Sequence, residues 1–375
     1  MVNEAFVMKT LKELHETPTA PYNEQRIIQY IERFAKQRKL PIKSDEYGNI
    51  VVRLNSGGKK PIAIMAHTDH PGFEAISYEK GALTARFHGG VPISYFRGAK
   101  PVFFPKNSSP AQTELISYKT DFYPRTRRKR VKEVLLKCPK NVPTGTPGMW
   151  GKPFIKLQGS FIHAWAHDDV SGVALILCAL NECIERKLKV NIYAIFSRAE
   201  ETGFTGCIGF FETLKKHKLI PEGTPVISVE TSKHLPGARQ GKGIVLRTGD
   251  RKMTFDPKLI NFMEKTAGEI SAETKDFAYQ KKLMDGGTCE ATVFTLFGHP
   301  AAGLALPLGN YHNVNRRERK ISPEIIHKRD LLTGIRLFAE MAARIGKMEE
   351  QWKDLRNWLL EHSAAGRGRL KNGRW

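Results

Sequence analysis

The chain has 375 residues, of which 41% are hydrophobic, and its 60 Lys and Arg against 38 Asp and Glu give a formal net charge of +22 at pH 7. This composition excludes a disordered or fibrous protein, and no stretch approaches the roughly 18 apolar residues that a membrane-spanning helix needs. The length favours more than one domain.

The N-terminal segment and the cysteines indicate a reducing compartment. Residues 1–16 (MVNEAFVMKTLKELHE) contain three Glu and no uninterrupted apolar run, which predicts an amphipathic helix rather than a signal peptide. The five cysteines are scattered without a CxxC pair, and Cys178 and Cys183 are spaced so that they face different sides of a predicted helix. We therefore expect separate core thiols and a cytoplasmic location.

Two basic runs contribute to the positive charge, residues 125–132 (RTRRKRVK) and residues 366–375 (GRGRLKNGRW). Basic runs can bind phosphate backbones, which keeps nucleic acid among the candidate partners. However, no helix-turn-helix, RNP or zinc-finger pattern accompanies them. We therefore favour a solvated basic surface over a nucleic-acid interface.

Along most of the chain, apolar strands alternate with amphipathic helices, which predicts an α/β sandwich with a largely parallel sheet. A second helix is expected at 23–39, followed by strands at 49–54 and 61–66. The alternation resumes later with helices at 168–187, 256–268 and 287–296 and strands at 190–196, 225–230, 243–248 and 301–307.

Residues 73–159 have a different pattern, with short β-like pieces such as ALTARF, PVFF and EVLLKC separated by Gly, Pro and Ser. This pattern predicts an inserted all-β domain, which leaves residues 1–72 and 160–346 as one discontinuous domain. A last helix of that domain is expected to begin at Ser322 and Pro323, an N-cap followed by Pro in the first turn. Residues 347–375 are predicted to be a helical extension, with its helix at 349–362, and a disordered basic tail.

Glu200 and Glu201 lie side by side where the strand at 190–196 ends. Adjacent residues in an extended segment point to opposite sides, so one glutamate could bind a metal while the other transfers a proton. For this stretch alone, a solvated pair in an ordinary turn is the alternative. Partners elsewhere in the chain decide between the two interpretations.

Four other strand or helix ends carry residues that bind metals in proteins. They are His67 and Asp69 after the strand at 61–66, Asp168 and Asp169 at the helix at 168–187, Glu230 at the end of the strand at 225–230, and His312 after the strand at 301–307. The carboxyl ends of parallel strands meet in one crevice of an open sheet. Two His and three carboxylates suit a pair of divalent cations with a position left for water, which is a hydrolytic arrangement.

In order and character, the residues His67-x-Asp69, Asp168-Asp169, Glu200-Glu201, Glu230 and His312 resemble those of the co-catalytic metallo-aminopeptidase clan. The long gap between Asp69 and Asp168 resembles the tetrahedral, dodecameric aminopeptidases, which include glutamyl, leucyl and deblocking aminopeptidases and proteins once labelled endoglucanases. The likeness extends from about residue 5 to about residue 345 and includes the segments HTDHPGF, GGTCEATVF and YHN.

The resemblance implies a zinc-exopeptidase-like α/β/α sandwich in which residues 1–72 and 160–346 form the catalytic domain. The insert at 73–159 would be a small PDZ-like β-barrel that mediates dimerisation and assembly of up to twelve copies into a hollow particle. The implied substrate is a peptide that loses its N-terminal residue.

The resemblance also implies a role for each site residue. Asp168 would bridge two divalent metals, zinc with cobalt or manganese as alternatives, and would be joined to Asp169 by a cis peptide bond. His67 and Glu230 would complete one metal site, and Glu201 and His312 the other. Glu200 would be the general base for a metal-bridging water, and Asp69 would orient His67.

The sequence departs from the family pattern at His70-Pro71, where an acidic residue is frequent, at Val170, where Arg is common, and at Glu230, where Asp is usual. Two other functions remain as alternatives: a metal-dependent amidohydrolase or deacylase of small N-acyl substrates, and a non-catalytic basic binding module. Retention of every ligand and of the base argues against the binding module, because carboxylates crowded together without a cation are costly.

Overall fold

The computed structural model describes residues 2–122 and 128–373, and its largest element is an eight-stranded sheet with the order β1-β2-β13-β3-β14-β17-β15-β16. The strands are β1 (Ile42–Ser44), β2 (Ile50–Asn55), β3 (Ile62–His67), β13 (Asn191–Ser197), β14 (Val226–Lys233), β15 (Ile244–Gly249), β16 (Tyr279–Leu283) and β17 (Ala301–Leu308). The four central strands, β13, β3, β14 and β17, are parallel. The predicted α/β fold with a mostly parallel sheet is therefore confirmed.

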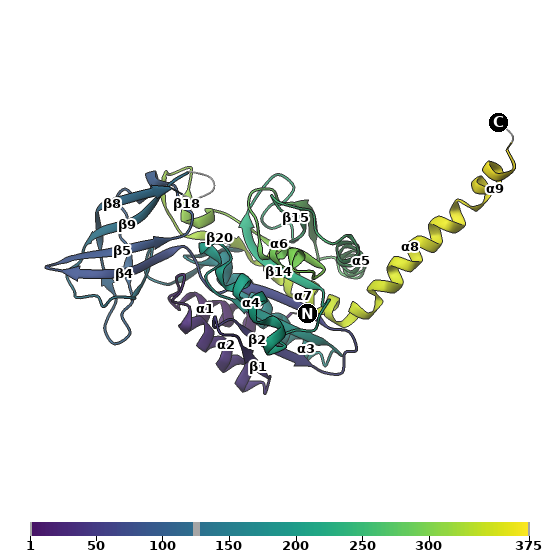
Figure 1. Cartoon of the computed structure of the whole chain (residues 1–375), viewed down its shortest axis with the longest axis horizontal. Helices are drawn as coiled ribbons and strands as arrows, with labels where there is room; N and C mark the ends of the chain where they lie inside the picture. Colours follow the sequence, from purple (N-terminus) through teal and green to yellow (C-terminus); the bar gives the residue numbers. More distant parts are fainter. Residues whose placement is uncertain (1, 123–127, 374–375) are drawn as a thin grey trace.

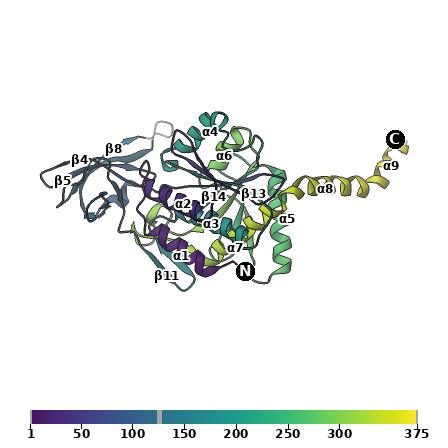
Figure 2. The same cartoon turned by 90° about the horizontal axis from the view of Figure 1, so that it is seen from below.

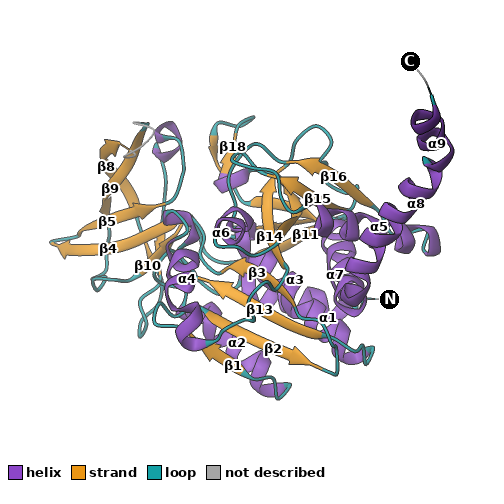
Figure 3. Cartoon of the chain, turned by 45° about the vertical axis from the view of Figure 1, so that its right-hand side comes forward, coloured by secondary structure: helices purple, strands orange, loops and turns teal. Residues whose placement is uncertain are grey.

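Helices cover both faces of this sheet. They are α1 (Glu4–His15), α2 (Gln25–Gln37), α3 (His167–Glu185), α4 (Thr205–His217), α5 (Pro257–Glu273), α6 (Glu290–Leu296) and α7 (Lys328–Arg344). Figure 2 shows α1, α3 and α7 on one side of the sheet and α4 and α6 on the other. Figure 3 shows the twist of the sheet between these two layers. The central strands are buried because both faces are covered, which explains their continuous apolar runs, whereas the edge strands β1 and β16 are partly exposed.

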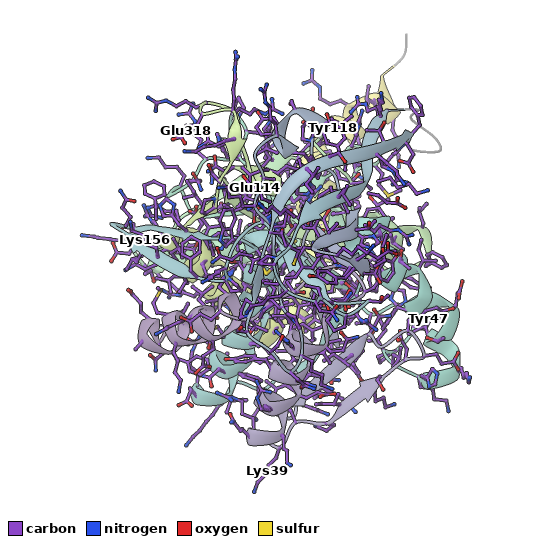
Figure 4. The ribbon with its side chains drawn as sticks, turned by 90° about the vertical axis from the view of Figure 1, so that its left-hand side faces the viewer. Lys39, Tyr47, Glu114, Tyr118, Lys156 and Glu318 are labelled. Carbon is purple, nitrogen blue, oxygen red and sulfur yellow. The ribbon has the colours of Figure 1, made fainter. Side chains whose placement is uncertain are left out.

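The insert is a second, antiparallel sheet with the order β7-β6-β10-β4-β5-β9-β8, curved into a half-barrel. Its strands are β4 (Gly72–Glu79), β5 (Ala82–His88), β6 (Val102–Phe103), β7 (Ala111–Gln112), β8 (Glu114–Phe122), β9 (Lys129–Lys137) and β10 (Pro147–Met149), with a short 3-10 helix, η1 (Ile93–Phe96). It stands to one side of the body, the rest of the α/β domain (Figure 1). Figure 4 looks onto this side, where Glu114 and Tyr118 mark the outer strand β8.

Two smaller sheets connect the insert to the body. Strand β12 (Phe161–Ala164) pairs with β11 (Ile155–Gln158) and with β20 (Glu324–His327), and β18 (Val314–Asn315) pairs with β19 (Lys320–Ile321). Because β11 pairs within the first of these sheets, the antiparallel sheet of the insert ends at Met149, earlier than the predicted boundary at 159.

The last helix of the body does not begin at Ser322, contrary to the prediction. Glu324–His327 forms strand β20, and α7 begins only at Lys328 with His327 as its N-cap. The burial of β20 alternates along the strand, and pairing with β12 satisfies its backbone groups. Distant strand pairing therefore overrides the local signal of a capped helix.

The C-terminal extension is helical and projects away from the body (Figure 1). It consists of α8 (Met348–His362) and α9 (Ala364–Asn372). The tail up to 372 was predicted to be disordered and is instead a helix, in which Ala364, Ala365 and long unbranched side chains favour continuation of the helical path. Residues 125–127 of one basic run and 374–375 of the other lie outside the described residues.

Within residues 2–122 and 128–373, none of the helices has the length and apolar character needed to cross a membrane.

Candidate metal centre

The five predicted metal ligands converge at the carboxyl ends of the parallel strands. His67 ends β3 and Glu230 lies in β14, Glu201 follows β13 in a short 3-10 turn, and Asp168 and His312 lie in the segments at α3 and after β17. Ligand atoms of His67, Asp168 and Glu230 lie within 4.8 Å of one another, as do those of Asp168, Glu201 and His312. Asp168 belongs to both groups.

The two carboxylate oxygens of Asp168 face different histidines. Oδ1 lies 3.4 Å from Nε2 of His67, and Oδ2 lies 3.5 Å from Nε2 of His312. His312 Nε2 also lies 3.2 Å from Oε1 of Glu201. One carboxylate therefore stands between two imidazoles, which is the geometry of a ligand shared by two cations.

Glu200 is outside these two groups but belongs to a third, in which ligand atoms of His67, Glu200 and Glu201 lie within 4.8 Å of one another. Its Oε2 is 3.9 Å from Nε2 of His67, and its side chain lines the cleft over the site. Burial raises the pKa of Glu200 well above its ordinary value, and the carboxylates of Glu201 and Glu230 raise it further. A carboxylate in such surroundings can accept and hold a proton near neutral pH.

The histidines take on positive charge to balance the carboxylates. Burial alone would lower the pKa of His67, but the adjacent carboxylates of Asp168 and Asp69 raise it well above 6.5. Burial likewise opposes protonation of His312, yet Glu201 and Asp168 raise its pKa well above the same value. A divalent cation would supply this positive charge and displace the protons.

Two buried oxygens at the site have no hydrogen-bond partner among the described residues, Oδ1 of Asp168 and Oε1 of Glu230. Burial raises the pKa of Glu230 to about 8, and Asp168 contributes to the rise. Unpartnered buried carboxylate oxygens are costly unless a cation binds them. The oxygen and imidazole donors present here fit borderline divalent metals.

Asp69 holds the two glutamates as well as His67. Its carboxylate accepts hydrogen bonds from the backbone N–H groups of Glu200, at 2.9 Å, and Glu201, at 3.0 Å. Nδ1 of His67 lies 3.2 Å from the backbone carbonyl of Asp69 and 3.5 Å from its Oδ1. The predicted contact with His67 is present, and the larger effect of Asp69 is to fix the turn that carries Glu200 and Glu201.

Sequence reasoning missed Glu324, which is fully buried behind the site. Its carboxylate accepts hydrogen bonds from the backbone N–H groups of Asp168, at 3.0 Å, and His312, at 2.8 Å. It therefore ties together the backbones of two predicted ligands that are far apart in the chain. The only local signal was a glutamate after Ser-Pro, which looks the same as an ordinary helix start.

His70, one of the departures from the family pattern, also supports the site from behind. Its Nδ1 contacts the backbone carbonyl of Asp168, and its Nε2 lies 2.9 Å from Oδ1 of Asn313. Asp169 accepts a hydrogen bond from Thr231 at 2.8 Å, and the peptide bond between Asp168 and Asp169 is cis. These contacts hold the backbone of Asp168 and the carboxylate of Asp169 in place.

Two cavities adjoin the centre. A cleft of about 870 Å³ between the body and the insert is lined by Glu200, Glu201 and Tyr311 on the body side. A smaller cavity of about 70 Å³ is lined by Glu230 and Tyr311 together with Lys233 and Arg247.

Arg247 is 3% exposed and donates hydrogen bonds to Ser232 Oγ and to the carbonyl of Gly287. Its Nε has no partner within the described residues.

The fold and these ligand groups define an α/β protein with a candidate dinuclear metal centre at the switch point of its sheet. The family model for M42 glutamyl aminopeptidase matches residues 48–331. The chain therefore belongs to this family of metallo-aminopeptidases, and the resemblance found in the sequence is confirmed.

Solved structures show the same fold. The TET aminopeptidase of a marine sediment Thaumarchaeota archaeon has a TM-score of 0.75 and 20% identity, with 93% of this chain and 99% of that chain covered. The TET1 peptidase of Pyrococcus horikoshii can assemble into a tetrahedron or a large octahedral shell. It has a TM-score of 0.69 and 19% identity, with 90% of this chain and 99% of that chain covered. A protein of Thermotoga maritima described as an endoglucanase has a TM-score of 0.63 and 19% identity, with 91% of this chain and 98% of that chain covered.

Proposed function

We propose that the protein is a dinuclear metal-dependent aminopeptidase that removes N-terminal residues from short peptides. The observation that supports this most directly is the position of Asp168 between His67 and His312, with one carboxylate oxygen toward each. A single shared carboxylate between two ligand groups suits hydrolysis assisted by two cations.

His67, Asp168 and Glu230 would hold one ion, and Asp168, Glu201 and His312 would hold the other. Zinc suits this set of imidazole and carboxylate ligands, with cobalt and manganese as alternatives. Such ions polarise the scissile carbonyl and lower the pKa of water.

Glu200 would act as the general base. It lines the cleft beside both ligand groups, and Asp69 fixes its backbone. Glu200 would accept a proton from the attacking water and return it to the leaving amine, so that the peptide bond breaks with no net change of charge on the carboxylate. Its burial favours a pKa at which both steps are accessible.

The 70 Å³ cavity beside Glu230 would receive the side chain of the N-terminal residue. Arg247 is buried there with an unpartnered Nε among the described residues, and Lys233 adds a second positive charge. A buried guanidinium favours a carboxylate partner. We propose that N-terminal Glu and Asp are preferred, in agreement with the glutamyl aminopeptidase family to which the chain belongs.

Assembly into homo-oligomers would use the insert. Strand β8 is at the edge of its sheet and exposes Ile116, Tyr118 and Phe122. An exposed apolar edge strand is a ready surface for pairing with another copy. Relatives assemble into dodecamers and larger shells.

The test compares the wild type with Glu200→Gln on a panel of aminoacyl-p-nitroanilides and short peptides, with bound metal measured in both proteins. We expect two metal ions per chain in each, fastest cleavage of N-terminal Glu and Asp by the wild type, and a loss of at least about 10³-fold in kcat for the variant. Metal without peptide cleavage, together with hydrolysis of N-acyl amides, would favour the amidohydrolase alternative. Absence of metal would contradict both enzymes and favour a basic binding module.

A further inference from the structure

The 870 Å³ cleft has walls of opposite charge. The body contributes Glu200 and Glu201 beside the metal centre. The insert contributes three cations, Arg86 from β5 and Arg130 and Lys132 from β9, against one carboxylate, Asp121 from β8. The volume is within the range of sites that bind small ligands, about 300–1,000 Å³. A substrate bound at the metal centre would therefore extend toward the basic wall.

The charges of Arg86 and Lys132 are available to a ligand. Arg130 donates to Asp121 at 2.7 Å, and His88 lies 2.9 Å from Glu74, so these cleft residues already have carboxylate partners. Over residues 2–122 and 128–373, neither Arg86 nor Lys132 forms an ion pair within 4.0 Å, and both are exposed. Carboxylates lie near both cations, but each has another partner. Glu74 and Glu133 are opposite Arg86 in the strand ladders and pair with His88 and Lys119. Asp121, whose pKa the charge of Lys132 helps to lower, pairs with Arg130.

A β-bulge places Lys132 on this wall. In the pairing of β8 with β9, Lys119 is opposite Glu133 while Thr120 is opposite Val131, which leaves Lys132 without a partner in the ladder. Val131 occupies the core-facing position and is 2% exposed, whereas the side chain of Lys132 lines the cleft. Bulges next to active sites redirect a side chain in this way.

We propose that Arg86 and Lys132 bind the C-terminal carboxylate of short peptide substrates, which makes the cleft a site for peptides with both ends free. This inference rests on the proposed aminopeptidase function, which puts the N-terminal residue at the metal centre. An extended peptide spans about 3.3–3.6 Å per residue, so the carboxylate of a peptide of about three or four residues remains within the cleft. Guanidinium and ammonium groups then form charge-assisted hydrogen bonds with it.

The experiment compares a tripeptide with a free C terminus and the same tripeptide as its C-terminal amide, both with N-terminal Glu. The wild type is expected to prefer the free acid by about tenfold in kcat/KM, since two partly exposed charge pairs contribute. In Arg86→Ala/Lys132→Ala this ratio is expected to fall toward one, and in Arg86→Glu/Lys132→Glu it is expected to invert. The single variants Arg86→Gln and Lys132→Gln retain the long side-chain stems and are expected to give intermediate ratios.

The matched control is Lys119→Ala/Lys137→Ala, which removes the same charge from the paired strands β8 and β9 of the insert, outside the cleft lining. Its free-acid preference is expected to equal that of the wild type. A decapeptide provides a second control, because its C terminus lies beyond the cleft and should show no acid preference.

A wild-type ratio near one, or an equal loss of preference in the control variant, would overturn the inference while peptide cleavage still supported the proposed function. No cleavage of any peptide would overturn the proposed function, and the inference with it.

Discussion

The insert and the body of this protein bury different kinds of side chain. The core of the insert is aromatic and aliphatic, with Phe73, Phe87, Phe96, Phe103 and Trp150 in contact, and the buried polar side chains described within it are Thr113 and Thr146. The body has an apolar core of its own, but at the carboxyl ends of its strands it also buries several carboxylates. They include Asp69, Asp168, Asp169, Glu230, Glu290 and Glu324.

This difference separates stability from function. Apolar burial stabilises a fold by about 25 cal/mol per Å², whereas a buried carboxylate is unfavourable until a partner or a cation compensates for it. Among the described residues, the core of the insert therefore contains no buried charge that a cation would have to compensate. In the body, the large apolar cluster sustains a site that becomes favourable when cations bind.

The largest expected effect comes from opening the core of the insert. Phe96 is fully buried, with its ring centroid 4.9 Å from that of Phe87 and 5.1 Å from that of Trp150. Phe96→Ala should lower the free energy of unfolding of the insert by about 3–5 kcal/mol, because a large cavity remains. Chemical denaturation followed by tryptophan fluorescence measures this change.

Phe297→Ala is the control, because Phe297 is 52% exposed in the body and its removal leaves no cavity. Metal content should stay at the wild-type level in both variants. A metal content of Phe96→Ala clearly below that of Phe297→Ala would show that the core of the insert and the metal centre of the body are not independent.

A smaller effect is expected from loosening the carboxylate that supports the site. In Glu324→Gln only one side-chain oxygen remains to accept the N–H groups of Asp168 and His312, since the amide nitrogen is itself a donor. Metal affinity should fall by about 10- to 100-fold, as is typical for residues that orient metal ligands. Competition with a chelator measures the affinity.

Glu318→Gln makes the same chemical change on the exposed β18–β19 turn and should leave affinity unchanged. Loss of thermal stability in Glu324→Gln at unchanged metal affinity would limit Glu324 to a structural role.

The smallest effect concerns proton uptake by the buried polar network of the body. Burial lowers the pKa of His15 to about 3, and His15 packs against His167 with ring centroids 4.6 Å apart. Because the unfolded chain binds a proton near pH 6.5 and the folded one does not, the stability contributed by neutral His15 is present above pH 6.5 and is lost as pH falls toward 3.

Between pH 7.5 and 6.0 the wild type should lose about 0.8 kcal/mol more stability than His15→Gln, which has no group to titrate there. Denaturant titrations at the two pH values give this difference. A larger loss in the variant than in the wild type would show that His15 is already protonated in the folded state.

The strands and ligands of the body could be predicted because each signal is local. A strand buried on both faces is a continuous apolar run, and a candidate metal ligand lies at the end of one, as His67 does, or a few residues beyond it, as Glu201 does. Parallel strands bring such ends together whatever the details of the loops. This is why the order of the residues alone was enough to place the candidate site.

The supporting residues could not be predicted because their roles depend on pairing between distant segments. Glu324 reaches the site only because β20 pairs with β12, more than 150 residues away in the chain, and the local Ser-Pro-Glu signal favoured a helix. Lys132 lines the cleft only because β8 and β9 pair with a bulge. Arg247 is a buried charged residue in the strand β15, and the sequence pattern alone does not explain why a charge is buried there.

The projecting helices α8 and α9 have a practical consequence. At about 1.5 Å per residue, the 15 residues of α8 make a helix about 22 Å long, which packs against α5 at its beginning and then leaves the body. Helix α9 lies at the end of the molecule opposite the insert in both Figure 1 and Figure 2. An affinity tag attached there would immobilise the protein, and a fluorophore attached there would label it, without blocking the cleft.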